Sequence, residues 1–408
     1  MAGAPKANAV VGQSGGPTGV INASLAGVIE EACKHAQIEA LYGAVHAVSG
    51  IVKEQFIDLK KVSAADLEAV AASPSSALGS SRDKPDKAYC ERIFNVFKKR
   101  NVRYFFYIGG NDSANTAHII NTMAAEVGYD LRCFHVPKTI DNDLLVTDHC
   151  PGFGTAARFV ACAAMGGDLD NRALPGVKID VIMGRHAGFL TAAAALGRRQ
   201  EDDGPHLVYV PEAPFDTGKF LADVAAVFKR HGRCLVAVSE GIVDKDGQPI
   251  AAKLAVEQGH HVERDSHGNV QLSGSGALGD FLSVAIKSKL GIKRVRSDTF
   301  GYLQRSFAGL QSPVDAAEAR RCGQEAVRFA METISGSVAM KRTGNGTRYG
   351  VEYFRTDLAN VAEKTKSLAP EYINADGNGV TAAFVEYAMP LTGGVPKTAY
   401  LGNYPRVK

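Results

Sequence analysis

The stretch Val102-Arg-Tyr-Phe-Phe-Tyr-Ile-Gly-Gly-Asn-Asp-Ser113 indicates the fold of this chain. Its apolar and aromatic half, Val102–Ile108, predicts a buried strand, and residues 114–126 predict a helix. Gly109-Gly110 between them forms a tight turn that directs backbone N–H groups and a helix N-terminus at an anion. Asp112 is unexpected there because a carboxylate repels a phosphate. It therefore caps the helix, binds a metal or excludes a ligand.

The next predicted strand, Leu131–Val136, runs into Pro137-Lys-Thr-Ile-Asp-Asn-Asp143. The ends of parallel strands are where an open α/β sheet presents its chemistry. A lysine beside carboxylates suits phosphoryl transfer, because a base takes a proton from an alcohol while a cation or metal offsets phosphate charge. A solvated Asp/Asn turn before a helix is the alternative for this stretch alone.

Other segments repeat the strand–turn order. We also expect a strand over 41–48, an alanine-rich helix from 152 to about 165 and another alanine-rich helix after Phe189. A strand over 9–11, the turn Gly12–Gly19 and a helix over 20–35 form a phosphate-type turn or a purely structural one. The predicted strands 177–182 and 234–239 end at Arg185 and Glu240 respectively. Arg185 holds a phosphate or is a surface residue, and Glu240 binds a sugar hydroxyl or caps the next element. Similarly, Arg82 in Gly79-Ser-Ser-Arg82 reaches a phosphate or lies on a flexible loop.

Strands alternating with helices predict an α/β fold with mostly parallel, doubly wound sheets. The length of 408 residues favours two domains. A net charge of +3 gives no argument for nucleic-acid or membrane binding. The seven scattered cysteines lack a C-x-x-C pair, which favours reduced thiols. Without a signal-like N-terminus or a long apolar run, we expect a cytoplasmic protein.

Several motifs together resemble the phosphofructokinase family, and within it the pyrophosphate-dependent members. They occur in the family's order over roughly residues 8 to 320. The matching blocks are Gly15-Gly16, Gly79-Ser-Ser-Arg82, Gly109-Gly-Asn-Asp-Ser113, Pro137-Lys-Thr-Ile-Asp-Asn-Asp143, Met183-Gly-Arg185, Glu240 and Gly301-Tyr-Leu-Gln-Arg305.

The resemblance implies a phosphofructokinase fold of two Rossmann-like domains. Residues 1–150 with about 306–385 would bind the phosphoryl donor, residues 151–305 the sugar phosphate, and residues 386–408 would form a C-terminal tail. The implied reaction is a reversible transfer to the 1-hydroxyl of fructose 6-phosphate, serving glycolysis and gluconeogenesis, with Mg²⁺ as cofactor.

The resemblance also implies the role of each site residue. Asp141 would be the general base, which Thr139 and Asp143 would orient together with the sugar. The remaining substrate-binding residues would be Gly15, Gly16, Arg82, Met183, Gly184, Arg185, Glu240, Arg296, Tyr302 and Arg305. Arg296 matches an arginine supplied across a subunit interface, so a homodimer or homotetramer is expected.

The choice of donor depends on Asp112 and Lys138. ATP-using members carry glycine at both positions. Asp112 would repel the region of the ATP α-phosphate, and Lys138 would stabilise inorganic phosphate as the leaving group, so pyrophosphate is the expected donor. The alternatives are an ATP-dependent 6-phosphofructokinase, a distant lipid or nicotinamide-nucleotide kinase, and a non-catalytic sugar-phosphate sensor.

The chain departs from the family pattern in a few places. Asn111 stands where many members have a metal-linked aspartate, and it is the candidate metal ligand. Gly176 stands where bacterial ATP-dependent members have a cross-subunit arginine, which Lys178 or Arg172 could replace. Tyr302 replaces a histidine, which could widen the pocket toward sedoheptulose 7-phosphate. The role of residues 341–408 is left open.

Overall fold

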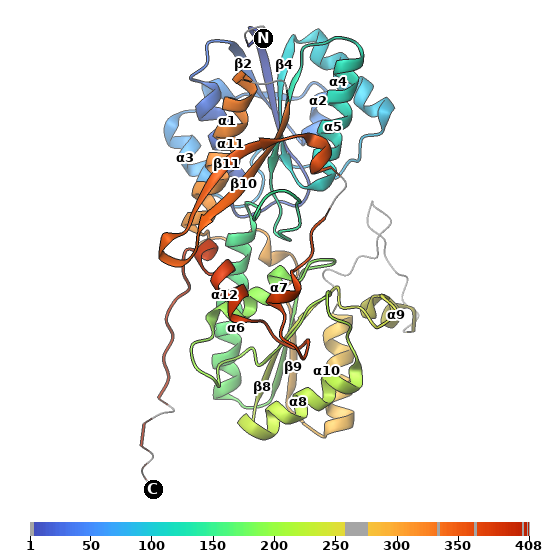
Figure 1. Ribbon diagram of the computed structural model, residues 1–408, viewed down its shortest axis with the longest axis vertical. Coiled ribbons are helices and arrows are strands. Elements are labelled where there is room, and N and C mark those ends of the chain that lie inside the picture. The colour runs from blue at the N-terminus through green and yellow to red at the C-terminus, as the bar shows by residue number, and fades with distance from the viewer. Residues whose placement is uncertain are drawn as a thin grey trace.

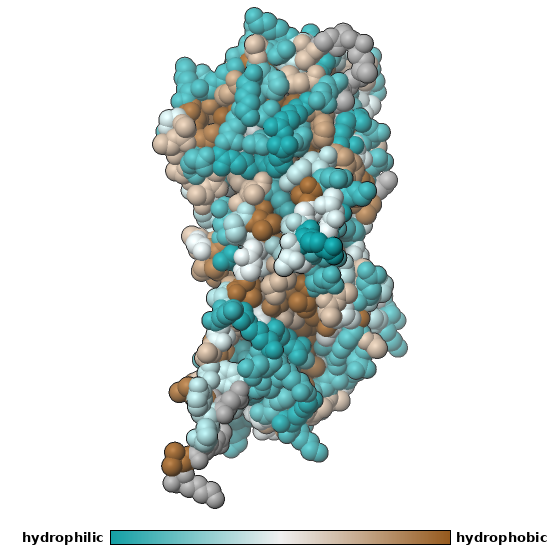
Figure 2. Space-filling model, turned by 60° about the vertical axis from the view of Figure 1, so that its left-hand side comes forward, coloured by the Kyte–Doolittle hydropathy of each residue, from teal (hydrophilic) through white to brown (hydrophobic). Residues whose placement is uncertain are grey.

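The computed structural model describes residues 4–257, 276–332, 335–362, 365–401, 404–405 and 407. Figure 1 shows two sheet-and-helix halves stacked along the long axis of the molecule. The first half contains a seven-stranded sheet in the order β11-β10-β5-β4-β1-β2-β3, and the second a four-stranded sheet in the order β7-β8-β6-β9. The face shown in Figure 2 is largely hydrophilic, and apolar residues gather on it at the waist between the halves.

The strands of the seven-stranded sheet are β1 (Ala7–Gln13), β2 (Ile38–Ala44), β3 (Phe56–Asp58), β4 (Val102–Gly109), β5 (Arg132–Pro137), β10 (Gly336–Gly344) and β11 (Gly350–Thr356). The strands of the four-stranded sheet are β6 (Val177–Ile182), β7 (Leu207–Tyr209), β8 (Cys234–Ser239) and β9 (Val295–Thr299). All neighbours are parallel except β2–β3 and β10–β11. The predicted α/β fold with mostly parallel sheets is therefore confirmed.

The described α-helices are α1 (Ile21–Ala32), α2 (Ala47–Val52), α3 (Ala64–Ala72), α4 (Lys87–Lys99), α5 (Asn111–Glu126), α6 (Phe153–Ala173), α7 (Phe189–Ala193), α8 (Thr217–His231), α9 (Ile250–Glu257), α10 (Ala277–Leu290), α11 (Pro313–Glu332) and α12 (Ala382–Ala388). A short 3₁₀-helix, η3, covers Gly301–Gln304. None of the helices within the described ranges is long and apolar enough to cross a membrane.

Helices α1 and α11 cross at very short range on one face of the seven-stranded sheet. A Cβ atom on Gly27 would lie 1.9 Å from the carbonyl oxygen of Arg320, and one on Gly323 would lie 2.1 Å from that of Ser24. Only glycine permits this backbone approach. Helix α11 comes after the four-stranded sheet in the sequence. The chain has therefore returned to the first half when α11 packs on α1.

The structure differs from the sequence expectations in several elements. The predicted strand over 41–48 is β2 followed by helix α2, and the alanine-rich helix expected after Phe189 is only the short α7 and one 3₁₀ turn. Helix α6 continues past residue 165 to Ala173. The antiparallel hairpin of β10 and β11 has no counterpart among the predicted elements.

The C-terminal residues contact both halves. The backbone N–H of Lys366 donates to the Asp143 carbonyl at 2.8 Å in the first half, and that of Val208 donates to the Asn378 carbonyl at 2.9 Å in the second. The two-domain boundaries and the tail over 386–408 stay predictions, and part of that tail lies outside the described residues.

Candidate active site

The turns after β1, β4 and β5 meet at the carboxyl edge of the seven-stranded sheet. The Nζ atom of Lys138 donates to the Gly16 carbonyl at 2.8 Å, and its backbone N–H donates to the Gly109 carbonyl at 3.0 Å. Gly15 has a φ of +76°, and a Cβ atom there would lie 3.1 Å from Nζ of Lys138. The glycines therefore give the lysine side chain the space in which it lies.

Lys138 is buried, with 4% of its surface exposed. Its pKa is lowered to about 8, mainly by burial and in part by the positive charges of Arg305 and Arg82. The carboxylates of Asp141 and Asp143 act in the opposite direction. The predicted pairing of this cation with the two acids is thus present in space, in a setting where its charge acts with little screening.

The carboxyl groups of Asp141 and Asp143 lie on the same turn as Lys138. Burial raises the pKa of Asp141, and the charges of Arg305 and Lys138 oppose this rise. The pKa of Asp143 is raised to about 6, mainly by burial and in part by the neighbouring charge of Asp141. The Thr139 hydroxyl accepts from the backbone N–H of Asp141 at 3.0 Å, which fixes the turn.

Asn111 begins α5 beside this pair. Its Nδ2 atom donates to Oδ2 of Asp143 at 3.4 Å, a long hydrogen bond. Its Oδ1 atom is buried and has no hydrogen-bond partner. An unpartnered buried acceptor beside a carboxylate is a chemical setting that suits a hard cation.

Asp112 lies in the first turn of α5 and is exposed. Its Oδ1 atom is 3.1 Å from Nζ of Lys84. The pair joins the start of α5 to the loop that follows Arg82, so the carboxylate lies at the outer margin of the buried cluster.

The loop 79–82 packs on the glycine turn after β1. The Gly15 N–H donates to the Ser81 carbonyl at 3.0 Å, and the Ser80 hydroxyl donates to the Gly15 carbonyl at 2.6 Å. Arg82 is exposed, yet its charge lowers the pKa of both Lys138 and Arg305. The structure thus brings Arg82 to the rim of the cluster.

The second half contributes the turns after β6 and β8. Gly184 has a φ of +146°, and its carbonyl accepts a hydrogen bond of 2.7 Å from the Ser239 hydroxyl. Glu240 is buried, and its backbone N–H donates to the Ile182 carbonyl at 2.9 Å. Arg185 lowers the pKa of Asp141 by its charge, which places it at the same cluster.

The segment Gly301–Arg305 connects the two halves. Oε1 of Gln304 accepts from the Met183 N–H at 3.2 Å, which holds this segment on the β6 turn. The Arg305 guanidinium lies 4.7 Å from the ring centre of Tyr302. A Cβ atom on Gly16 would lie 3.3 Å from the same guanidinium. Burial lowers the pKa of Arg305, and the Arg82 charge adds to this effect.

Arg296 is a predicted site residue that the described contacts do not bring to the cluster. It lies exposed on β9, and its Nη1 atom donates to the carbonyl of Val295 at 3.0 Å. Its role at the site of a partner subunit stays a prediction.

The proposed substitutes for the arginine absent at Gly176 are engaged within the chain. Arg172 bonds Asp168, Asp202 and Asp203, and Lys178 bonds Asp180 and Asp298. A Cβ atom on Gly176 would lie 2.8 Å from Cγ of Arg294, so Arg294 fills the space of a side chain there.

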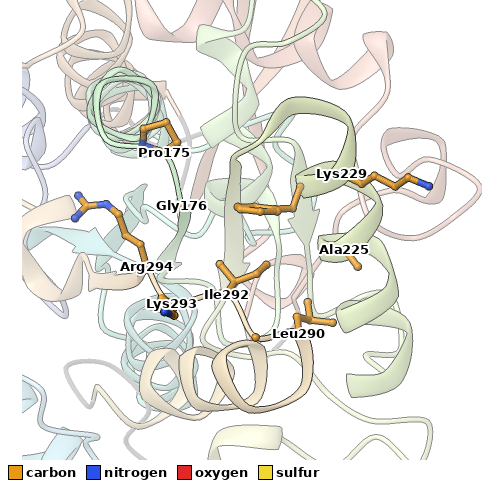
Figure 3. Close-up of a pocket in the computed structure, with 10 residues that line it drawn as sticks. Pro175, Gly176, Ala225, Lys229, Leu290, Ile292, Lys293 and Arg294 are labelled. Carbon is orange, nitrogen blue, oxygen red and sulfur yellow. The ribbon is translucent and has the colours of Figure 1, made fainter.

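Gly176 and Arg294 line an open pocket of about 540 Å³ between α8 and α10 (Figure 3). This pocket lies at the amino ends of β6 and β9, whereas the cluster lies at the carboxyl ends of the strands. It is therefore separate from the candidate active site.

The sequence reasoning missed some residues of the cluster. Gln304 and Ser239 hold backbone turns, Lys84 pairs with Asp112, and the charge of His186 lowers the pKa of Asp141. Gln304 lies inside the recognised block Gly301–Arg305 and His186 directly follows the block Met183–Arg185, so their position was a usable signal. Lys84 had no such signal, because its partner is distant in sequence.

Buried acids and a buried lysine lie at the strand ends, and arginines surround them. This arrangement is typical of proteins that transfer phosphoryl groups. Residues 8–330 match the family model described as phosphofructokinase, and the chain belongs to the phosphofructokinase family.

Its relatives narrow the comparison. The chain is 56% identical over 393 residues to the pyrophosphate–fructose 6-phosphate 1-phosphotransferase of Rhodospirillum rubrum, covering 96% of each chain. It is 39% identical to the enzyme of the same name from Xanthomonas campestris, covering 96% of this chain and 93% of that one. A pyrophosphate-dependent phosphofructokinase from Nitrosospira multiformis has a similar structure, with a TM-score of 0.85, 34% identity and coverage of 98% of this chain and 95% of that one.

Proposed function

We propose that this protein reversibly transfers a phosphoryl group from pyrophosphate to the 1-hydroxyl of fructose 6-phosphate, giving fructose 1,6-bisphosphate and phosphate. The observation that carries this proposal is the buried Lys138 on the same turn as Asp141, against the glycine turn after β1. The close relatives that carry this activity in their names support it.

Asp141 acts as the general base. It accepts the proton of the 1-hydroxyl while that oxygen attacks phosphorus, and it needs no special basicity because the alcohol becomes acidic only as the new bond forms. The positive charges of Arg305, Lys138 and Arg185 favour its ionised form. Thr139 fixes the turn through its bond to the Asp141 N–H, and Asp143 supports the same turn and the sugar.

Lys138 neutralises the charge that develops on the departing phosphate. Its contact with the Gly16 carbonyl holds the ammonium beside the glycine turn after β1, where the donor phosphate binds in this proposal. Asp112 lies at the outer margin of the cluster, where its carboxylate repels the longer phosphate chain of a nucleotide. It therefore disfavours ATP as donor relative to pyrophosphate.

Met183, Gly184, Arg185, Glu240, Tyr302 and Arg305 bind the sugar phosphate in this proposal. Arg185 and Arg305 supply cations for the 6-phosphate, and guanidinium groups suit phosphate oxygens. The carboxylate of the buried Glu240 accepts a hydrogen bond from a sugar hydroxyl. Arg82 reaches the transferred phosphate from the opposite rim.

Mg²⁺ fits this site, because the buried Oδ1 atom of Asn111 lacks a hydrogen-bond partner and a carboxylate lies beside it. When bound, the ion neutralises phosphate charge and orients the donor. Within the described residues there is no group of three or more His, Cys, Asp and Glu side chains placed to hold a metal. Asn111 would therefore share the ion with phosphate oxygens and water, as is usual for Mg²⁺.

The proposal includes a homodimer or homotetramer in which Arg296 serves the site of a neighbouring subunit. Tyr302, Leu303 and Phe307, in the segment that follows β9, leave 49%, 62% and 42% of their surfaces exposed, which is consistent with an apolar contact. A cytoplasmic location is also proposed.

An aldolase-coupled assay with each donor tests the proposal. The purified wild type is expected to phosphorylate fructose 6-phosphate with pyrophosphate and not with ATP. The double substitution Asp112→Gly and Lys138→Gly is expected to lower kcat/KM for pyrophosphate by about 10²-fold or more, since a transition-state cation is removed.

The matched control is Asp280→Gly, which makes the same change in the first turn of α10 and should leave activity unchanged. Activity with ATP alone would overturn the donor assignment. Binding of fructose 6-phosphate without turnover by either donor would overturn the enzymatic role and favour a sensor.

A further inference from the structure

The segment Thr365–Leu368, named here the strap, lies between the two halves of the molecule. It belongs to the stretch that links β11 in the upper half to α12 in the lower half (Figure 1). Thr365 forms an antiparallel bridge with Leu144, and the Lys366 N–H donates to the Asp143 carbonyl at 2.8 Å. The strap therefore pairs directly with the turn that carries the candidate catalytic acids.

The side chain of Lys366 follows the same turn. Its Nζ atom donates to the carbonyl oxygens of Thr147 at 3.0 Å and Asp148 at 2.6 Å. Two backbone carbonyls are thus held by one cation, and such charge-assisted bonds are stronger than neutral ones. Nζ also lies 5.8 Å from the ring centre of Phe189, the first residue of α7 in the second half.

The other end of the strap is fixed to the second half. Oε1 of Glu212 accepts from the Leu368 N–H at 2.7 Å and from the Gly188 N–H at 2.9 Å. Gly188 follows the turn that holds Met183 and Arg185. One carboxylate therefore joins the strap to the candidate sugar-phosphate turn.

We propose that Lys366 is a positioning residue for phosphoryl transfer, which fixes the turn of Asp141 and Asp143 against the second half of the molecule. The proposal rests on the proposed function, because it assumes that these two acids act in the reaction. Lys366 touches the backbone of the turn and not the reacting groups, so its effect is on geometry.

The charges around Lys366 support a fixed cation. Burial lowers the pKa of its ammonium, whereas Cys150, Asp148 and Asp143 raise it, and Arg342 lowers it further. The Asp148 carbonyl also accepts from the Tyr387 hydroxyl at 3.0 Å. Tyr387 in turn accepts from Nδ2 of Asn142, between the two acids, at 2.8 Å. Two side chains from the C-terminal part thus converge on one turn.

The test compares Lys366→Met with Lys341→Met, which removes an exposed lysine from β10. Steady-state kinetics are measured per folded protein. The Lys366 variant is expected to lose about 10²-fold in kcat, since small displacements of catalytic groups have effects of this size. Its KM for fructose 6-phosphate should stay within about threefold, because the binding residues are untouched. Lys366→Arg is expected to restore most of kcat.

A purely structural role gives a different pattern. If folded Lys366→Met keeps the wild-type kcat, or if only KM rises, the proposal is overturned. It is also overturned if Lys366→Arg is as slow as the methionine variant. Should Lys366→Met fail to fold, Tyr387→Phe tests the same anchor. It is expected to lower kcat several-fold at constant KM, and an unchanged kcat would overturn the proposal.

The donor assignment is tested separately in the same experiment. The ratio of variant to wild-type kcat is taken with whichever donor the wild type uses. If the wild type uses ATP as donor, the pyrophosphate assignment is refuted. The ratio of Lys366-variant kcat to wild-type kcat, measured with ATP, then still tests the role of Lys366. A wild type without turnover by either donor would refute both, because the acids would then have no reaction to serve.

Discussion

The Nζ atom of Lys138 donates a hydrogen bond to the Gly16 carbonyl across 2.8 Å and 122 residues of sequence. This contact links the turn after β5 to the turn after β1. It places a buried cation where the glycines leave room for a phosphate. Lys138 is nevertheless a costly residue for the folded state, because burial disfavours its charge.

Lys138→Met should stabilise the protein at neutral pH. The pKa of Lys138 falls from 10.5 to about 8 on folding. A shift of this size costs the wild-type folded state about 3 kcal/mol at pH 7, and the methionine variant avoids this cost. The variant also loses the hydrogen bond to Gly16, which reduces its gain in stability by about 1 kcal/mol. The cost is fully present below the folded pKa and disappears as pH rises through the unfolded pKa.

Urea unfolding between pH 7 and pH 10.5 measures this effect. The excess unfolding free energy of the variant over the wild type should shrink across that range. Lys341→Met, at an exposed lysine, should show no such trend. A difference that does not change with pH would contradict the assignment of the buried charge.

Asp141→Asn should remove the general base while keeping the size of the side chain. We expect kcat to fall about 10³-fold, within the range for loss of a positioned base. The KM for fructose 6-phosphate should change little. The control is Asp130→Asn, at an exposed aspartate remote from the site. If Asp141→Asn retains a tenth or more of the wild-type kcat, another group is the base.

Asn111 should set the Mg²⁺ requirement. Asn111→Asp adds a carboxylate and should lower the half-saturating Mg²⁺ concentration, whereas Asn111→Leu should raise it, each by about tenfold. Calorimetric titration with Mg²⁺ and pyrophosphate reports binding apart from turnover. Asn95→Asp, on the exposed face of α4, is the control. Chelation with EDTA should abolish activity, and added Mg²⁺ should restore it.

Gly27→Ala should destabilise the α1–α11 crossing. The new methyl group would lie 1.9 Å from the Arg320 carbonyl, so the helices must separate, at a cost of about 1–3 kcal/mol or more. Gly166→Ala in α6 meets nothing within 4 Å and should stabilise by about 0.5–1 kcal/mol through helix propensity. Thermal unfolding of both variants gives the comparison, and equal shifts would contradict the packing argument.

The fold class was predictable because the central strands β1, β4, β5, β6 and β8 have strong apolar runs and lead into glycine-containing or acidic turns. Such local signals placed Asp141 and Lys138 correctly at a strand end, and parallel strands bring their carboxyl ends together. The recognised motifs also contained Arg185 and Arg305, whose charges meet at Asp141.

Contacts between distant segments were not predictable in this way. The pairing of Lys84 with Asp112, and of Lys366 with the turn at Asp148, depends on how loops cross in space. The alanine run after Phe189 has high helix propensity, yet tertiary packing limits it to the short α7. The β10–β11 hairpin lacks the strong apolar alternation of the other strands, since much of β11 is only half-buried.

The position of β10 next to β5 affects how the chain is made. During synthesis β5 emerges long before β10, and β6 to β9 come between them. The edge of β5 beside His135 therefore remains unpaired while the whole four-stranded sheet is being translated. An open strand edge invites pairing with other chains. The nascent protein thus carries an open strand edge directly before its candidate catalytic turn until β10 is made.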